Sequence, residues 1–241
     1  MSIPKNQITT KSKLHPRSRY KTRYNFKELI VSTPELKHYV FKNKYGDLSI
    51  DFFDPKAVKI LNRALLKYNH NIAFWDIPKG YLCPPIPGRL DYIHYMADLM
   101  ECTSKNPNII GLDIGTGANC IYPLLGHNEY GWNFIATDID KSAIDSAKNI
   151  VSKNKLNASI EIRLQENKAN KKASEINMQS NALVIIGMHR SGTSALSGLL
   201  DELGVFMGKS LFAAQKGVNE KGFFENSELV KLNDLLLDAQ L

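Results

Sequence analysis

Residues 108–140 contain the feature that most constrains the fold: an apolar run, a glycine-rich turn, and a second apolar run that ends on acids. The turn reads Asp113-Ile114-Gly115-Thr116-Gly117, and the second run ends at Asp138 and Asp140. Glycine lets the backbone turn sharply and approach a ligand closely. An acid about one β-α-β step later can accept hydrogen bonds from ribose hydroxyls. The pairing therefore predicts a site for a nucleoside-containing cofactor.

The segments around this turn alternate between strand and helix patterns. Apolar runs predict strands over residues 108–114, 133–138 and 158–164, and amphipathic spacing predicts a helix over 141–153. Asp140 stands where an N-cap of that helix is expected. Such alternation is typical of a parallel sheet in an α/β fold.

The region before the sheet is predicted to begin polar and extended, over residues 1–24, and then to become helical. Helices are expected over 26–30, behind Thr33-Pro34, from Pro55 to Tyr68 and over 90–102, and residues 76–88 are expected to form an irregular loop.

Positive charge is concentrated at the N-terminus. Residues 1–44 contain eleven Lys and Arg against Glu28 and Glu35, a local balance of +9, so the other 197 residues sum to −2 of the total +7. A basic arm on a near-neutral body is typical of proteins that contact phosphate backbones. The alternative is a merely solvated basic tail. Interleaved aromatic residues such as Tyr20 and Tyr24 favour contact with nucleic acid, because aromatic rings stack on bases.

Composition argues against several classes of protein. No apolar run approaches the roughly 18–20 residues that span a bilayer, and the N-terminus lacks the apolar segment of a secretory signal. The three cysteines (Cys83, Cys102 and Cys120) have no CxxC spacing and are expected to be reduced thiols, with no metal site. A cytoplasmic protein is expected.

The short Asp-x-Gly-x-Gly form of the turn favours S-adenosylmethionine over a dinucleotide. In that arrangement Asp113 orients the loop and the methionine amine, and Gly115 and Gly117 pass close to the ligand. Asp138 accepts hydrogen bonds from the ribose.

Further motifs give residues 12–165 a resemblance to one family. The motifs are Leu14-His15-Pro16-Arg17, Arg23-Tyr24-Asn25-Phe26, Asn43-Lys44-Tyr45-Gly46, Ser49-Ile50-Asp51-Phe52, Leu61-Asn62-Arg63-Ala64-Leu65-Leu66, Cys83-Pro84-Pro85, Arg89-Leu90-Asp91-Tyr92-Ile93-His94 and Gly115-Thr116-Gly117-Ala118-Asn119-Cys120-Ile121-Tyr122-Pro123-Leu124. Together they resemble the bacterial 23S rRNA (adenine-N6) methyltransferases of the RlmF type. The resemblance implies methyl transfer from S-adenosylmethionine to N6 of one adenine in 23S rRNA, in the cytoplasm.

The resemblance also implies roles for individual residues. The cofactor would be held by Asp113, Gly115, Gly117 and Asp138, and its carboxylate by Arg89, expected just before the helix that precedes the first strand. Arg89 can instead be a surface arginine at a helix start. The RNA backbone would be gripped by Lys13, Arg17, Arg19 and Arg23.

One motif of adenine methyltransferases is missing from the chain. Enzymes of this kind carry an Asn/Asp-Pro-Pro-aromatic loop after the fourth strand, which accepts hydrogen bonds from the exocyclic amine and stacks on the flipped base. At the corresponding place this chain reads Ile185-Ile186-Gly187-Met188-His189-Arg190. Catalytic residues are therefore not assigned, and this segment is not expected to replace the loop.

The segment after this strand has a pattern of its own. Gly187-Met188-His189-Arg190-Ser191-Gly192-Thr193-Ser194 has the frame of a phosphate-binding loop, and residues 181–241 resemble the opening part of sulfotransferase-like proteins. The resemblance implies that the 5′-phosphate side of the sulfate donor PAPS would be held by Arg190, Ser191, Gly192, Thr193 and Ser194. The alternative is a plain strand-to-helix turn.

The sequence thus predicts four parts within an α/β architecture. They are a basic RNA-binding arm and helical lead-in (1–100), a truncated Rossmann-like S-adenosylmethionine core (101–165), a linker or junction (166–180) and an incomplete P-loop-like β-α fragment (181–241). Three hypotheses stay open: an rRNA methyltransferase, a protein that binds cofactor and RNA without chemistry, and a sulfotransferase-type protein.

Overall fold

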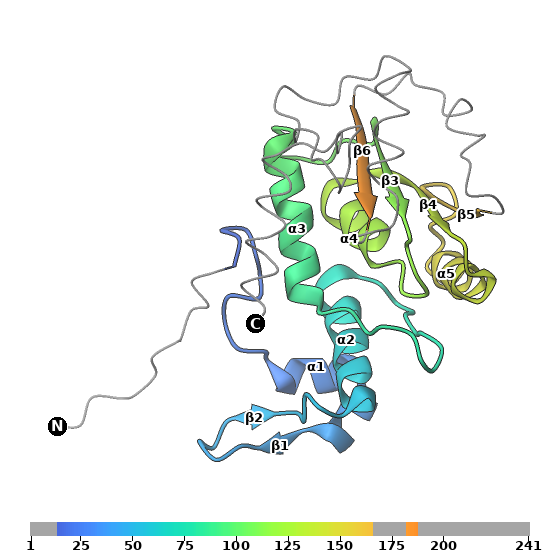
Figure 1. Cartoon of the computed structure of the whole chain (residues 1–241). Helices are drawn as coiled ribbons and strands as arrows, with labels where there is room; N and C mark the ends of the chain where they lie inside the picture. The colour runs from blue at the N-terminus through green and yellow to red at the C-terminus, as the bar shows by residue number, and fades with distance from the viewer. Residues whose placement is uncertain (1–13, 166–181, 188–241) are drawn as a thin grey trace, which may run out of the picture.

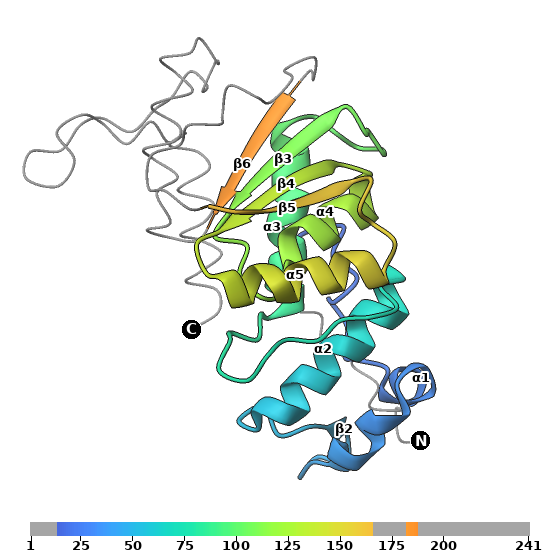
Figure 2. The ribbon, with the colours of Figure 1, turned by 90° about the vertical axis from the view of Figure 1, so that its right-hand side faces the viewer.

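A computed structural model describes residues 14–165 and the backbone of residues 182–187 (Figure 1). Four strands form one parallel sheet in the order β5-β4-β3-β6. Their bounds are β3 (Ile109–Ile114), β4 (Asn133–Asp138), β5 (Ile160–Leu164) and β6 (Ala182–Gly187). Figure 2 shows β6 along the outer side of β3, with β4 and β5 following on the other side.

Two helices connect β3, β4 and β5: α4 (Ile121–Tyr130) and α5 (Lys141–Lys153). Both connections move across the sheet in the same direction, so right-handed crossovers place α4 and α5 on the same face. Glycine allows α4 to approach that face closely. A Cβ on Gly126 would lie 2.5 Å from Cζ of Phe134 in β4, and one on Gly111 in β3 would lie 2.3 Å from Cε1 of the same ring.

The N-terminal part is built from helices and one small hairpin. Its elements are α1 (Phe26–Ser32), the 3-10 helix η1 (Pro34–Tyr39), β1 (Phe41–Lys42), β2 (Leu48–Ser49), α2 (Pro55–His70) and α3 (Ile86–Leu99). Figure 1 shows α1, α2 and the hairpin at the end of the molecule away from the sheet, with α3 running from there alongside it. Asp54 caps α2 by accepting a hydrogen bond from the amide of Lys56 at 2.8 Å, and Asn71 ends it in the left-handed conformation.

A single hydrophobic cluster joins the two halves of the described chain. It extends from Tyr20 through the helices of the N-terminal part to Ile162 in β5. Trp75 and Trp132 are among its largest fully buried side chains. Both predicted parts, 1–100 and 101–165, therefore contribute to the same core. Among the described residues, no helix has the length and apolar character that crossing a membrane requires.

The structure confirms the predicted parallel sheet, the strand at 133–138 and the helix at 141–153. It also confirms Asp140 as the N-cap of that helix, because its side chain accepts a 2.8 Å hydrogen bond from the amide of Ser142. The predicted extended segment is wrong over residues 14–24, which form turns with buried side chains at His15 and Tyr20. The helix expected over 90–102 begins earlier, at Ile86, because Pro87 is well tolerated in a first helical turn. Arg89 consequently lies inside α3 rather than before it.

Candidate functional site

The loop after β3 is folded back onto the end of β4. The amides of Gly115 and Thr116 donate to the carbonyl of Thr137 at 2.9 and 3.0 Å, and the amide of Gly117 donates to Oδ2 of Asp138 at 2.9 Å. Gly115 and Gly117 have φ values of +77° and +63°, which side chains disfavour. The two glycines are thus required by the turn that brings backbone close to the carboxyl edge of the sheet.

Asp138 ends β4 at this edge. Its Oδ1 accepts from the amide of Asp140 at 2.9 Å, so both carboxylate oxygens are oriented by backbone. A carboxylate has about four lone-pair sites, and Asp138 can therefore still accept ribose hydroxyls. The next residue, Ile139, is 75% exposed. Sequence reasoning missed Ile139, whose apolar surface beside the acid suits the flat face of a nucleobase.

Asp113 lies at the end of β3 and is only 1% exposed. Its Oδ2 has no hydrogen-bond partner among the described residues. Burial raises the pKa of this carboxyl to about 7, against the opposing effects of Thr116 and the Arg89 charge. A ligand ammonium group would supply the missing partner and favour the ionised carboxylate. The residues present therefore fit the amine of S-adenosylmethionine.

Arg89 reaches the same region from the first turn of α3. It donates to the hydroxyl of Tyr122 at 2.6 Å, and its guanidinium carbon lies 5.4 Å from the centre of that ring. Tyr92 packs beside Tyr122 with ring centroids 5.2 Å apart. A guanidinium carries five N–H donors, so Arg89 can hold Tyr122 and a carboxylate together.

Two neighbouring side chains hold the remainder of the loop, and a third holds the segment after β4. Trp75 donates from Nε1 to the carbonyl of Asn119 at 2.9 Å, and Ser146 of α5 donates to the carbonyl of Ala118 at 2.9 Å. Tyr81 donates to Oδ2 of Asp140 at 2.5 Å. The sequence did not predict these supports; a lone tryptophan beside a proline-rich loop was the available signal for Trp75.

The predicted RNA-contacting arginines have carboxylate partners inside the molecule. Arg17 pairs with Asp98 at 2.5 Å, Arg19 pairs with Glu129 at 2.8 Å, and Arg23 pairs with Asp47. Their contact with RNA stays a prediction. Lys13 and the predicted phosphate-loop residues 190–194 lie outside the described residues.

The register of β6 shows where this strand ends. Gly187 pairs with Ile114 at the carboxyl end of β3, so β6 ends at the same edge of the sheet as Asp113 and the loop after β3. The resemblance to adenine methyltransferases implies an Asn/Asp-Pro-Pro-aromatic loop at this edge. In the sequence Gly187 is followed by Met188-His189-Arg190, which lie outside the described residues.

Comparison with known proteins agrees with this geometry. The model of a family described as RNA methyltransferase matches residues 8–181. A protein named ribosomal RNA large subunit methyltransferase F, from Cytophaga hutchinsonii, is 54% identical over 167 residues, which are 67% of this chain and 52% of the relative. The chain spans about half the length of the curated relatives it matches.

Solved structures show the same fold. The N-terminal domain of human METTL16 in complex with SAH matches with a TM-score of 0.64 and 31% identity, covering 79% of this chain and 76% of that one. The hMettl16 catalytic domain in complex with MAT2A 3′UTR hairpin 6 matches with a TM-score of 0.58 and 40% identity, covering 64% and 54%. The described part of the chain therefore has a METTL16-like methyltransferase fold.

Proposed function

The chain belongs to the RNA methyltransferase family, and on that premise we propose that it uses S-adenosylmethionine to methylate N6 of an adenine in 23S rRNA. The observation that carries the proposal is the buried Asp113 carboxyl, which lacks a partner on Oδ2 beside a glycine loop bound to Asp138. A cationic amine and a ribose satisfy these two acids together.

Each residue of the site has a role in this proposal. Asp113 holds the ammonium group, Arg89 the carboxylate, and Asp138 the ribose hydroxyls, while the backbone at Gly115 and Gly117 lies along the ligand. Ile139 packs against the adenine. When bound, S-adenosylmethionine supplies the methyl group.

The RNA substrate is supported by the names of the relatives. They are called rRNA large subunit methyltransferase F, and an hMettl16 structure contains an RNA hairpin. The positive balance of the first 44 residues suits a phosphate backbone. We propose 23S rRNA as the partner and the cytoplasm as the place of action.

A methyl-transfer assay tests the proposal. Purified chain, labelled S-adenosylmethionine and 23S rRNA fragments are incubated, and N6-methyladenine is located in the product. Transfer to one adenine, lost in Asp138→Ala, is the expected result. Calorimetry without RNA adds an independent readout, and absence of any S-adenosylmethionine binding would refute the proposed site.

A second candidate is a protein that binds cofactor and RNA without transfer. The observation that favours it is the sequence after β6, where Arg190 brings positive charge and no Asn/Asp-Pro-Pro-aromatic loop follows. Normal binding of S-adenosylmethionine with no methylated product identifies this candidate. Turnover that is abolished by Arg190→Ala would instead show that the segment replaces the missing loop.

The sulfotransferase-like resemblance of residues 181–241 stays a hypothesis, and so does PAPS as its ligand. Residues 190–194, which would hold the phosphate, lie outside the described residues. A separate titration with PAPS tests it: heat of binding that disappears in Arg190→Ala supports the hypothesis, and no heat contradicts it.

A further inference from the structure

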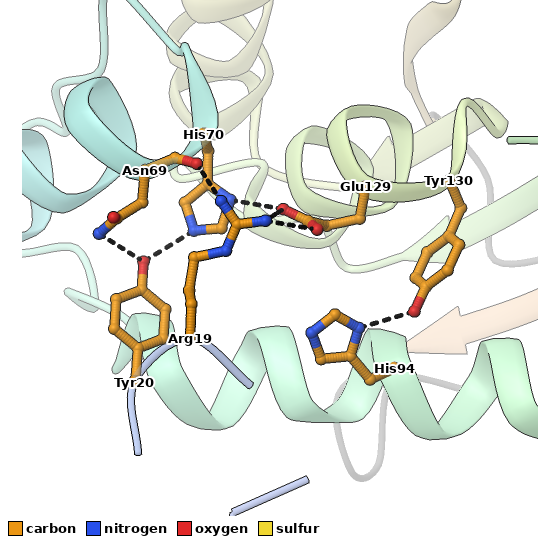
Figure 3. A network of polar contacts seen from close by, with 7 residues as sticks. All are labelled: Arg19, Tyr20, Asn69, His70, His94, Glu129 and Tyr130. Carbon is orange, nitrogen blue, oxygen red and sulfur yellow. Dashed lines mark hydrogen bonds and ion pairs between the residues drawn. The ribbon is translucent and has the colours of Figure 1, made fainter. Parts of the chain in front are cut away.

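The segment His15–Tyr20, which we call the clasp, lies against three helices that follow it in the sequence. The amide of His15 donates to Asp91 of α3 at 3.0 Å, and the hydroxyl of Tyr20 is 2.7 Å from Nε2 of His70 at the end of α2. Figure 3 shows Arg19 and Tyr20 side by side, with Arg19 directed toward Glu129 of α4. The clasp thus joins α2, α3 and α4.

The central contact of the clasp is the ion pair between Arg19 and Glu129. Nη2 of Arg19 lies 2.9 and 2.8 Å from the two oxygens of Glu129, and Nη1 donates to the carbonyl of Asn69. Nδ1 of His70 lies 2.9 Å from Oε1 of the same carboxylate. The side chain of Glu129 is 12% exposed and that of His70 is fully buried. A carboxylate removed from water in this way needs its partners to stay ionised.

The electrostatics of Glu129 agree with that requirement. Burial alone would raise its pKa, but the hydrogen bond from His70 and the charge of Arg19 hold the pKa below its ordinary value. Glu129 is therefore an ionised group that depends on the clasp. Loss of Arg19 would leave its charge poorly compensated.

Arg17 makes a second set of contacts, with α3 and with the end of α4. It donates to the carbonyl of His94 at 2.8 Å, pairs with Asp98, and lies with its guanidinium carbon 5.6 Å from the ring centre of Tyr130. Tyr130 is itself bound to Nδ1 of His94 at 2.7 Å (Figure 3). Both arginines therefore hold the last turn of α4 against α2 and α3.

The other end of α4 begins at the cofactor loop. Ile121, its first residue, follows Cys120 directly, and its amide is capped by Asn119 at 3.1 Å. A helix of this length is about 15 Å long and moves as one rod. A tilt permitted at Glu129 is thus transmitted to Asn119 and the loop, which hydrogen-bonds to β4.

We propose that Arg19 is a positioning residue: through Glu129 it fixes α4, and through α4 it sets the geometry of the S-adenosylmethionine loop. This role differs from a grip on the RNA backbone, which needs only positive charge facing solvent. The identity of the ligand rests on the proposed function, whereas the coupling of the clasp to the loop does not.

The test uses the full chain as wild type, Arg19→Ala, Arg19→Lys, Glu129→Gln and the double variant Arg19→Ala/Glu129→Gln. Lys67→Ala is the matched control, because it removes one exposed positive charge from the last turn of α2 without touching the clasp. S-adenosylmethionine affinity is measured by calorimetry well below the unfolding temperature. Hydrogen exchange of the amides of Gly115, Thr116 and Gly117 gives a readout that needs no ligand.

Both Arg19 variants are expected to weaken S-adenosylmethionine binding roughly 2- to 30-fold and to speed exchange in the loop by a similar factor. Lysine is not expected to rescue, because its single nitrogen cannot reach both the Glu129 carboxylate and the carbonyl of Asn69 as the two guanidinium nitrogens do. The double variant is expected to be no worse than the worse single variant, because the two residues act through one contact. Lys67→Ala leaves both quantities unchanged.

Two results would overturn the proposal. One is unchanged loop exchange in both Arg19 variants and in Glu129→Gln, even if their thermal stability falls. The other combines two observations: Arg19→Lys binds S-adenosylmethionine like wild type, and Arg19→Ala binds RNA more weakly. In that case the slope of RNA affinity against salt concentration would fall by about one, as expected of a phosphate contact. Wild type that binds no S-adenosylmethionine refutes the proposed function alone, since loop exchange still decides the role of Arg19.

Discussion

Asp113 is a buried acid whose folded-state pKa lies well above its unfolded-state value, which makes Asp113→Asn the most informative substitution. The pKa rises from 3.8 to about 7 because the carboxyl is removed from water. Between these two values the unfolded chain has released the proton and the folded chain has kept it. Unfolding therefore releases a proton in this window, and this group's contribution to stability falls as pH rises.

The size of the change in stability follows from the shift in the pKa of Asp113. A difference of about three pKa units corresponds to about 4 kcal/mol at roughly 1.4 kcal/mol per unit. The contribution is favourable below pH 3.8, declines through the window, and is fully lost above about pH 7. Asparagine is neutral at every pH, so residue 113 in the variant loses no stability as the pH rises. The stability of Asp113→Asn relative to wild type is thus expected to rise by about 4 kcal/mol between pH 4 and pH 8.

Urea unfolding measures this difference through the fluorescence of the buried residues Trp75 and Trp132. Comparing the two proteins at each pH removes the titration of all other groups. Asp145→Asn, which alters an exposed carboxylate on α5, is the control and is expected to stay parallel to wild type. A stability difference between Asp113→Asn and wild type that is constant from pH 4 to pH 8 would refute the reasoning.

Three further predictions concern the same edge of the sheet. The Kd for S-adenosylmethionine is expected to rise about tenfold per pH unit below about pH 7, because Asp113 must lose its proton to pair with an ammonium group, and calorimetry that gives a flat profile from pH 5.5 to 8 contradicts this. Asp138→Ala is expected to weaken the same binding about 10- to 100-fold by removing a charged acceptor, and an unchanged Kd counts against Asp138 as the ribose acid. Gly126→Ala is expected to destabilise the fold by about 1–3 kcal/mol, because its Cβ meets Phe134, and urea unfolding with an unchanged midpoint contradicts the close packing of α4 on β4.

The cofactor half of the fold was predictable because its determinants are local. Gly115 and Gly117 have the positive φ that their residue type permits, and Asp140 caps the helix that it precedes. The apolar runs predicted the succession of strands and helices along the chain, because this succession depends on local sequence. The same locality explains the confirmed bounds of β4 and α5.

The N-terminal arm was not predictable in this way. A string of charged and aromatic residues has no hydrophobic period, so its partners are decided by helices that lie 50 to 110 residues further along the chain. Arg19 and Tyr20 therefore have the composition of a solvated or RNA-binding arm while they pack against His70 and Glu129. The β1–β2 hairpin was missed for a related reason, because each of its strands has only two residues.

The pairing of β6 with β3 has a consequence for how this sheet accommodates change. Ladder hydrogen bonds join main-chain groups only, so the edge of β3 that pairs with β6 places little demand on the side chains of its partner strand. The residue at which the paired strand ends, Gly187 here, is then determined by that strand and not by residues 14–165, to which we assign cofactor binding. On the proposed function, the residues for methyl-donor binding and the strand that leads toward the substrate side thus lie on separate stretches of the sequence.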